Sequence, residues 1–322
     1  MVDNKQEPRI AVVIPCYRTR DKALEVIAGI GKEVTAIYAV DDKCPENTGQ
    51  RIVDECKDPR VRVMSNKENL GVGGAVMAGY RQALADGMDI IVKVDADGQM
   101  DPRLIPRFVK PVLTGEADYT KGNRFFNLES VRSMPKARLI GNLGLSFLAK
   151  LSTGYWDLFD PTNGFTAIHA KALELLPLAK ISNRYFFETD MLFRLNTVRA
   201  VVVDIPMEAR YEGETSSLQI SRVFTEFALK HAVNMAKRVI YNYFLRDFSI
   251  ASVELVAGTA FLLFGVVFGV GEWLESIATG EPATSGTVML AALPVIIGTQ
   301  SILAFLSYDI NSKPKRPLSS FI

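Results

Sequence analysis

Two long apolar segments near the C-terminus constrain the fold of this chain more than any other feature of its sequence. Residues 250–270 and 287–306 are each about 20 residues long, the length of helix that crosses roughly 30 Å of membrane hydrocarbon. The first segment contains one charged residue, Glu254, close to its start, and the second contains none. A core helix of a soluble protein would be shorter and would show a polar face. The sequence therefore predicts two transmembrane helices within residues 249–308.

The charges that flank these segments predict their orientation. Lysine and arginine precede the first segment and follow the second, at Lys230, Lys237, Arg238, Arg246, Lys313, Lys315 and Arg316. The connecting residues 271–286 contain Glu272, Glu275 and Glu281 but no lysine or arginine. Because positively charged flanks stay in the cytoplasm, we expect the loop 271–286 to lie outside. Both termini, including a tail of residues 309–322, are then expected on the cytoplasmic side of the inner membrane.

Residues 220–248 precede the first apolar segment and have a mixed character. Apolar residues recur at helical spacing, for example at Phe227, Val233 and Ile240, and basic residues lie between them. This pattern predicts juxtamembrane amphipathic helices that lie on anionic lipid. An amphipathic helix packed on the preceding domain would show the same pattern, and the two interpretations do not exclude each other.

The composition narrows the class of protein. The 322 residues carry 37 Lys and Arg against 36 Asp and Glu, a net charge of +1, so the totals indicate no surface for nucleic acid or another polyanion. The hydrophobic content of 48% argues against a disordered chain. Its three cysteines, Cys16, Cys44 and Cys56, are too few and too scattered for a disulfide scaffold or a zinc site. We therefore expect reduced thiols.

The first 219 residues alternate between strand and helix patterns. Strands are predicted at 10–14, 35–40, 61–64 and 90–94, and helices at 21–31, 48–56 and 74–85. Such alternation predicts an α/β domain with a mostly parallel, Rossmann-like sheet and helices on both faces. Ligands bind such sheets beyond the carboxyl ends of the strands. Those ends carry Pro15-Cys16-Tyr17, Asp41-Asp42 and Asp95-Ala96-Asp97, so polar residues follow the strands where a site is expected.

The sharpest local feature is Asp95-Ala96-Asp97. Two carboxylates at positions i and i+2 can share one divalent cation, and Gln99 could add a neutral oxygen. Hard oxygen ligands favour Mg²⁺ or Mn²⁺. Asp and Gly clusters after strands are usually plain turns, but the position at the end of an apolar strand favours the metal interpretation here.

Other familiar site motifs are absent from the sequence. Gly71-Val72-Gly73-Gly74 is not a dinucleotide fingerprint, because the third required glycine is Val76. No phosphate-binding P-loop sequence is present. His169 and His231 are isolated, so a structural or surface role is expected for each.

Taken in order, the motifs resemble those of the family 2 glycosyltransferases of GT-A fold. The resemblance covers residues 9–220 and is carried by Val12–Tyr17, Val40-Asp41-Asp42, Asn69–Ala75 and Asp95–Gln99. Gly122–Phe125 and Asp160–Phe165 are similar to the branch that glycosylates polyprenyl phosphates, which includes dolichyl-phosphate mannose synthases and bacterial enzymes acting on undecaprenyl phosphate.

The resemblance implies roles for the matching positions on the donor side. Three residues would hold the nucleotide base and ribose: Pro15, Tyr17 and Asp42. Three would hold a metal ion on the donor diphosphate: Asp95, Asp97 and Gln99.

Further matching positions concern the acceptor and the lining of the site. Arg124 and Arg138 correspond to arginines that bind the acceptor phosphate, and Arg210 would contact the donor diphosphate or that phosphate. Asp160 belongs to a turn that lines the site, and either Glu188 or Asp190 matches an acidic position. Mannose synthases often carry R-x-x-G-x-S-K after the last strand, whereas this chain continues from Arg210 to Ser217 without the lysine. Mannose is therefore not indicated as the sugar.

These features predict a membrane glycosyltransferase that moves a sugar from a nucleotide-sugar, for which the resemblance favours UDP, to a polyprenyl phosphate such as undecaprenyl phosphate. The resemblance further implies metal dependence, inversion at the anomeric carbon, and self-association. Two alternatives remain open: transfer to a glycan or protein acceptor in polysaccharide synthesis, and a non-catalytic membrane scaffold. A processive synthase would carry a Q-x-x-R-W element, which this sequence lacks.

Overall fold

The computed structural model describes residues 7–126, 136–208 and 220–321. The chain divides into two compact units, which are described separately. The first unit comprises Met1–Met235 together with Pro314–Ile322, and the second comprises Ala236–Lys313.

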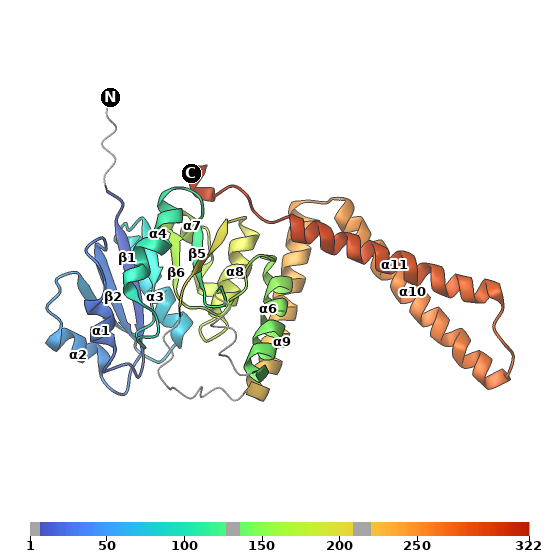
Figure 1. Ribbon diagram of the computed structural model, residues 1–322, viewed down its shortest axis with the longest axis horizontal. Coiled ribbons are helices and arrows are strands. Elements are labelled where there is room, and N and C mark those ends of the chain that lie inside the picture. The colour runs from blue at the N-terminus through green and yellow to red at the C-terminus, as the bar shows by residue number, and fades with distance from the viewer. Residues whose placement is uncertain (1–6, 127–135, 209–219, 322) are drawn as a thin grey trace, which may run out of the picture. The chain divides into compact units, whose positions relative to one another are not determined.

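Within the described residues, the first unit contains a seven-stranded sheet in the order β3-β2-β1-β4-β6-β5-β7 (Figure 1). The strands are β1 Ile10–Cys16, β2 Ala36–Asp41, β3 Val61–Ser65, β4 Ile90–Lys93, β5 Tyr119–Asn123, β6 Thr166–His169 and β7 Val202–Pro206. Strands β3, β2, β1 and β4 are parallel, β6 is antiparallel to both neighbours, and β7 is parallel to β5. The predicted mostly parallel sheet is confirmed.

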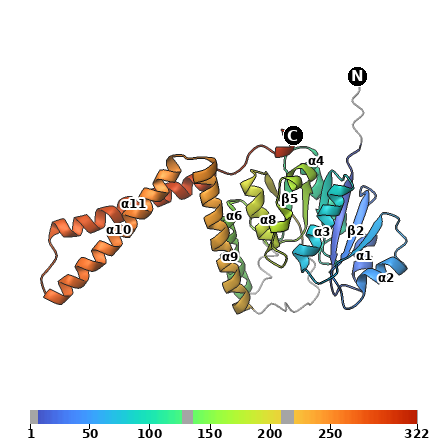
Figure 2. The ribbon, with the colours of Figure 1, turned by 180° about the vertical axis from the view of Figure 1, so that it is seen from behind.

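Helices cover both faces of this sheet, as predicted (Figures 1 and 2). The helices α1 Ala23–Ala28, α2 Thr48–Glu55, α3 Val72–Ala85, α4 Ile105–Leu113, α7 Ala170–Glu174 and α8 Phe187–Thr197 flank the sheet, and α6 Lys136–Thr153 and α9 Ile220–Ile240 lie beside α8. Alternate strand residues enter two separate cores. Val13 and Ile91 pack with α3 and α8 on one face, whereas Val12 and Val92 pack with α1 and α4 on the other. Both faces are buried, so the strands are apolar almost throughout.

The antiparallel strand β6 determines which loops meet. Because β6 runs against β4, its first residue Thr166 lies opposite Lys93, the last residue of β4. The turn 160–165 that leads into β6 therefore reaches the edge at which β1, β4, β5 and β7 end. Chain segments far apart in the sequence are thereby placed at one edge, next to the β1/β4 position where the strand order reverses.

The last residues of the chain belong to the first unit rather than forming a separate tail. Asp118, which is fully buried, accepts hydrogen bonds from the backbone nitrogens of Val201 (2.8 Å), Leu318 (2.9 Å) and Ser319 (3.0 Å). Leu318 also packs against the core on the α3 face. The prediction began the tail at residue 309; in the structure α11 ends at Asn311 and the chain rejoins the first unit at Pro314.

Helix α9 has one face packed on the first unit. The His231 Nδ1 atom lies 2.7 Å from the hydroxyl of Ser152 on α6, and Asn234 donates to Asp190 on α8 at 3.2 Å. Figures 1 and 2 show α6 and α9 side by side. Leu229 and Val233 point outward and are exposed. The predicted helix therefore packs on the domain and also presents an exposed apolar face; after Ile240 the chain continues as a π-helix, Tyr241–Arg246.

The second unit is dominated by two long apolar helices, α10 (Ile250–Thr279) and α11 (Ser285–Asn311), which contain the two predicted segments. Both are long and apolar enough to cross a membrane, and most of their side chains are exposed. Helix α10 continues past residue 270 to Thr279, so the predicted loop 271–286 shortens to residues 280–284. Gly280 ends the helix with a φ of 73°, a left-handed conformation that favours glycine.

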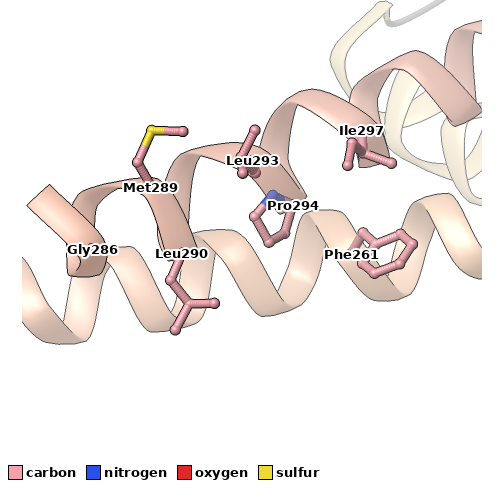
Figure 3. Close-up of a pocket in the computed structure, with 7 residues that line it drawn as sticks. All are labelled: Phe261, Gly286, Met289, Leu290, Leu293, Pro294 and Ile297. Carbon is pink, nitrogen blue, oxygen red and sulfur yellow. The ribbon is translucent and has the colours of Figure 1, made fainter.

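Small residues let α10 and α11 approach closely. Gly258, Gly265 and Gly298 are the buried glycines of the pair, and the carbonyl or side-chain atoms of the opposite helix lie against each of them. Further along, Phe261 of α10 and the α11 residues Leu290, Pro294 and Ile297 line an apolar groove (Figure 3). At the other end of the pair, Arg238 forms a bidentate ion pair with Asp309 at 2.6 and 3.0 Å, and both are buried.

We expect Gly298→Val to separate α10 from α11. A Cβ on Gly298 would lie 2.6 Å from the backbone nitrogen of Leu262 and 2.7 Å from the carbonyl oxygen of Gly258, and backbone atoms cannot yield without moving the whole helix. Disulfide formation between cysteines introduced at Gly269 and Ala291, whose Cβ positions adjoin, should fall at least about threefold. Gly271→Val is the control, since a Cβ there meets nothing within 4 Å. Undiminished cross-linking in Gly298→Val would contradict this packing.

We expect Asp118→Ala to destabilise the first unit by about 3–5 kcal/mol, because three partly buried backbone donors lose their acceptor. Urea unfolding of the full chain in detergent, followed by tryptophan fluorescence, measures this change. The exposed Glu116→Ala is the control. Deleting residues 314–322 should cause a loss that is not additive with Asp118→Ala, because both remove the same contacts. Full additivity would show that the tail is held elsewhere.

Candidate active site

Six of the predicted site residues come to the carboxyl edge of the sheet, from loops widely separated in the sequence. Asp42 follows β2, Asp95 and Asp97 follow β4, Arg124 follows β5, Asp160 lies in the turn before β6, and Glu188 is at the start of α8. Their placement follows from the strand directions, as described above for β6.

Pro15 and Tyr17 mark the end of β1. Pro15 is buried within the strand and lies opposite Val40 of β2. The Tyr17 side chain is 42% exposed, with the guanidinium carbon of Arg18 at 5.5 Å from its ring centroid. Tyr17 therefore offers an accessible aromatic face, whereas Pro15 shapes the strand end beneath it.

Asp42 organises the loop that precedes α3. Its carboxylate, which is nearly inaccessible, accepts hydrogen bonds from Asn66 Nδ2 (2.7 Å) and from the backbone nitrogens of Leu70 (2.9 Å) and Gly71 (2.7 Å). Gly71 has a φ of 85°, and a Cβ there would also meet the carbonyl oxygen of Asn183. The carboxylate thus fixes a glycine loop beside the strand end.

Asp95, Asp97 and Gln99 form a short half-buried turn after β4. Asp97 Oδ1 accepts from the backbone nitrogen of Gln99 at 3.0 Å, and Asp95 Oδ1 lies 2.7 Å from Lys93 Nζ. Among the residues that the structure describes, no group of three or more His, Cys, Asp or Glu side chains is arranged to hold a metal ion. The predicted set contains two carboxylates and one amide. Its hard oxygens, at an edge where they remain accessible, fit Mg²⁺ or Mn²⁺ with ligand oxygens completing the shell.

Lys93 was missed in the sequence analysis. It is the last residue of β4, only 1% exposed, and its Nζ lies between Asp95 and Glu188, at 2.7 and 3.8 Å. Burial alone would lower the pKa of this ammonium, but the charges of Asp95 and Glu188 outweigh it and the pKa is raised. A lysine at the end of an otherwise apolar buried strand was the available signal, since a buried lysine requires a partner.

The structure separates the roles of Glu188 and Asp190, which the sequence could not. Two residues apart on α8, they point to different sides. Glu188 faces Lys93, and burial raises its pKa to about 7 despite the nearby ammonium groups of Lys93 and Lys121. Asp190 instead accepts from the backbone nitrogen of Ser182 (2.9 Å) and from Asn234 (3.2 Å). Glu188 therefore belongs to the site, and Asp190 ties α8 to its surroundings.

Arg124 and Asp160 form a bidentate pair. The Arg124 Nε donates to Asp160 Oδ2 at 2.7 Å and Nη2 donates to Oδ1 at 2.9 Å. Burial favours the neutral form of Asp160, but the hydrogen bonds and charge of Arg124 prevail and lower its pKa. Asn163 also donates to Asp160 at 3.3 Å. The pair fixes the guanidinium, of which 23% of the side-chain surface stays exposed, at the sheet edge.

Two further buried ionisable residues adjoin this pair and were not found from the sequence. Lys121 of β5 is fully buried and donates to the carbonyl oxygen of Asn163; burial lowers its pKa to about 8. Asp204 of β7 accepts from Asn123 Nδ2 at 2.9 Å, and burial raises its pKa to about 6. Again, charged residues within buried strands were the only sequence signal.

Two predicted arginines cannot be placed in the site. Arg210 lies outside the described residues, as do the other residues of 209–219. Arg138 falls within α6, of which the structure describes the backbone but not this side chain.

The structural roles expected for the two histidines are confirmed. His169 precedes α7 and accepts from the backbone nitrogen of Lys171 at 3.2 Å. His231 is buried beside Ser152 and the ring of Phe186, and burial lowers its pKa to about 4. The cysteines described by the structure are free, as expected.

Several known proteins with similar sequences are sugar transferases. The family model described as Glycosyl transferase family 2 matches residues 11–176. The chain is 28% identical over 243 residues to the UDP-N-acetylglucosamine–dolichyl-phosphate N-acetylglucosaminyltransferase of Methanococcus voltae, covering 71% of this chain and 96% of that protein. It is 30% identical over 203 residues to the undecaprenyl-phosphate mannosyltransferase of Micrococcus luteus, covering 62% of this chain and 82% of that protein.

A solved structure shows the same fold. The crystal structure of glucosyl-3-phosphoglycerate synthase from Mycobacterium tuberculosis, in complex with Mn²⁺, UDP and glucosyl-3-phosphoglycerate, superposes with a TM-score of 0.53 at 20% identity. The match covers 72% of this chain and 80% of that one. The predicted GT-A architecture is confirmed by this likeness.

We expect Glu188→Gln to flatten the pH dependence of stability. Because the folded-state pKa of Glu188 is about 7 against 4.5 for an exposed glutamate, its stabilising contribution is complete below about pH 4.5 and is lost as the pH rises through 7. The wild type should lose roughly 3 kcal/mol from this group over that interval, and the variant should not. Asp204, with a pKa of about 6, contributes in the same direction in both proteins.

Urea unfolding of the full chain at pH 5, 6, 7 and 8 measures this slope. The exposed Glu174→Gln is the matched control and should retain the wild-type slope. An identical slope in Glu188→Gln and wild type would show that Glu188 is not held as a buried acid.

Proposed function

The chain belongs to glycosyl transferase family 2, and on that premise we propose that it transfers a sugar from a UDP-sugar to a polyprenyl phosphate, such as undecaprenyl phosphate, at the cytoplasmic face of the membrane. The observation that carries the proposal is the meeting, at one sheet edge, of the Asp95/Asp97 turn with the Arg124–Asp160 pair. The names of the M. voltae and M. luteus relatives, which act on dolichyl and undecaprenyl phosphates, support the acceptor class.

On the donor side, the Asp42-held glycine loop and the exposed Tyr17 face would receive the nucleotide, with Pro15 beneath. Asp95, Asp97 and Gln99 would hold Mg²⁺ or Mn²⁺, as their oxygen donors suit these ions. When bound, such an ion neutralises the charge that develops on the leaving diphosphate. The M. tuberculosis structure, which has the same fold and holds Mn²⁺ and UDP, supports a divalent ion and UDP as ligands.

On the acceptor side, Arg124 supplies a fixed cation, with Arg138 and Arg210 proposed as further phosphate ligands. A phosphate is already anionic at neutral pH, so its oxygen can attack the anomeric carbon without a general base. The new bond forms as the bond from that carbon to the diphosphate oxygen breaks on the opposite side, and the configuration inverts. The chain's residues therefore position the two substrates and neutralise the negative charge of their phosphates. Both histidines have structural roles, which agrees with a reaction that needs no imidazole base.

The membrane arrangement follows from the chain's connectivity. The chain leaves the first unit after Met235, forms the candidate spans α10 and α11, and returns to the first unit at Pro314. A hairpin whose two ends belong to one folded unit crosses the membrane twice, which leaves both termini on the same side. The flanking lysines and arginines favour the cytoplasm as that side. The exposed apolar residues of α9 would lie on the lipid surface, and self-association through the exposed hairpin is part of the proposal.

We expect transfer of labelled sugar from a UDP-sugar panel to undecaprenyl phosphate, recovered in the organic phase, and at least about a 100-fold lower kcat/KM in Asp97→Asn. Loss of a cation-binding carboxylate removes charge neutralisation at the leaving group. The exposed Asp54→Asn is the control and should keep the wild-type rate. Unchanged activity in Asp97→Asn, label remaining on protein or glycan, or product with retained anomeric configuration by NMR would contradict the proposal.

A further inference from the structure

The buried ammonium group of Lys93 forms a salt bridge with Asp95, one of the two aspartates proposed to bind the metal ion. Lys93 Nζ lies 2.7 Å from Asp95 Oδ1 and 3.8 Å from Glu188 Oε1, and 5.2 Å from the ring centroid of Phe187. The side chain of Lys93 is 2% exposed, whereas that of Asp95 is 25% exposed. The lysine thus meets Asp95 from the interior of the protein, and the aspartate still reaches the surface.

The fold leaves this ammonium no alternative position. Lys93 and Asp95 are two residues apart at the end of β4, so they project to the same face of the sheet, the face covered by α8. Helix α8 places Phe187 and Glu188 there. Gly164 closes the remaining side, because a Cβ on it would overlap Lys93 Nζ and Asp95 Oδ2. A buried ammonium that cannot reach water must stay with its carboxylates.

We propose that Lys93 is a resident cation of the donor site, which holds Asp95 in place of a divalent ion and thereby makes binding of that ion depend on the nucleotide diphosphate. The inference rests on the proposed function. A divalent ion arriving alone must share Asp95 with an ammonium group and is repelled by it. The diphosphate adds negative charge, which offsets that repulsion, so the ion and the nucleotide bind together.

Lys93 acts in this scheme as a positioning residue. Its charge also keeps Asp95 fixed while the site is open, which spares reorganisation when the donor binds. Glu188 moderates the effect, because it shares the ammonium with Asp95 and so weakens its hold on the metal-binding carboxylate.

The test is a titration of the full-length protein in detergent with Mn²⁺, followed by electron paramagnetic resonance, with and without UDP. In the wild type, UDP should tighten Mn²⁺ binding. Lys93→Met should bind Mn²⁺ alone at least tenfold more tightly, and UDP should then tighten binding at least tenfold less. The exposed Lys110→Met is the matched control and should behave as wild type. Mn²⁺ affinity that is unchanged or weaker in folded Lys93→Met would overturn the inference.

A double-mutant cycle covers the case in which Lys93→Met leaves the buried Glu188 and the partly exposed Asp95 without their shared cation and fails to fold. Lys93→Met combined with Glu188→Gln removes one charge of each sign and should fold more readily. Glu188→Gln alone should weaken Mn²⁺ binding, because the ammonium then rests wholly on Asp95. The double variant should bind Mn²⁺ at least tenfold more tightly than Glu188→Gln alone. Equal affinities of these two variants would overturn the inference.

The wild-type titration separates this inference from the function on which it rests. If the wild type binds no Mn²⁺ even with UDP, the metal-dependent function fails and the inference fails with it. If the wild type binds Mn²⁺ with UDP, but Lys93→Met binds Mn²⁺ like the wild type and the double variant binds it like Glu188→Gln, only the resident-cation role fails.

Discussion

Lys93 and Asp95 form their salt bridge where β4 ends, at the point where the buried sheet meets the open edge. An ionised side chain in a protein interior must be paired, and this requirement connects the parts of the site. Lys93 is satisfied by Asp95 and Glu188, Asp160 by Arg124, and Lys121 by the carbonyl oxygen of Asn163. The Lys93–Glu188, Arg124–Asp160 and Lys121–Asn163 contacts each join segments that are far apart in the sequence. The charged residues of the candidate site therefore also hold its segments together.

A buried carboxylate likewise holds a loop that has no ion pair of its own. Asp42 fixes the glycine loop before α3, and a Cβ on Gly71 would collide with the Asn183 segment just before α8. Asp190 of α8 accepts hydrogen bonds from the backbone nitrogen of Ser182 in that segment and from Asn234 of α9. The glycine loop, the segment before α8, α8 itself and α9 are therefore in continuous contact. Helix α9 leads directly toward the candidate membrane helices. The proposed donor site and α9 thus share one set of packed elements in the first unit.

The C-terminal residues add a second connection between the apolar hairpin and the first unit. Asp118 is buried at the start of β5, at the opposite edge of the sheet from the site, and its carboxylate binds the backbone of Leu318 and Ser319. A buried carboxylate that accepts from two backbone nitrogens of the tail favours this chain path, since any other path leaves it with Val201 as its backbone donor. The apolar hairpin is therefore flanked in the sequence by segments that belong to one folded unit.

The sequence by itself determined the strands of the first half of the sheet, the two apolar helices and the motif residues, because these depend on local patterns: apolar runs, periodicity and short carboxylate spacings. It did not determine which of Glu188 and Asp190 faces the site, since that depends on how α8 lies on the sheet. Nor did it reveal Lys93, Lys121 and Asp204, whose partners come from distant segments, or the return of the tail to Asp118. Helix α10 extends to Thr279 because glutamate is a good helix former, so the helix continues until Gly280 ends it. Only the tertiary structure decided that the Asp160 turn lies beside the end of β4, because this depends on the antiparallel insertion of β6 between β4 and β5.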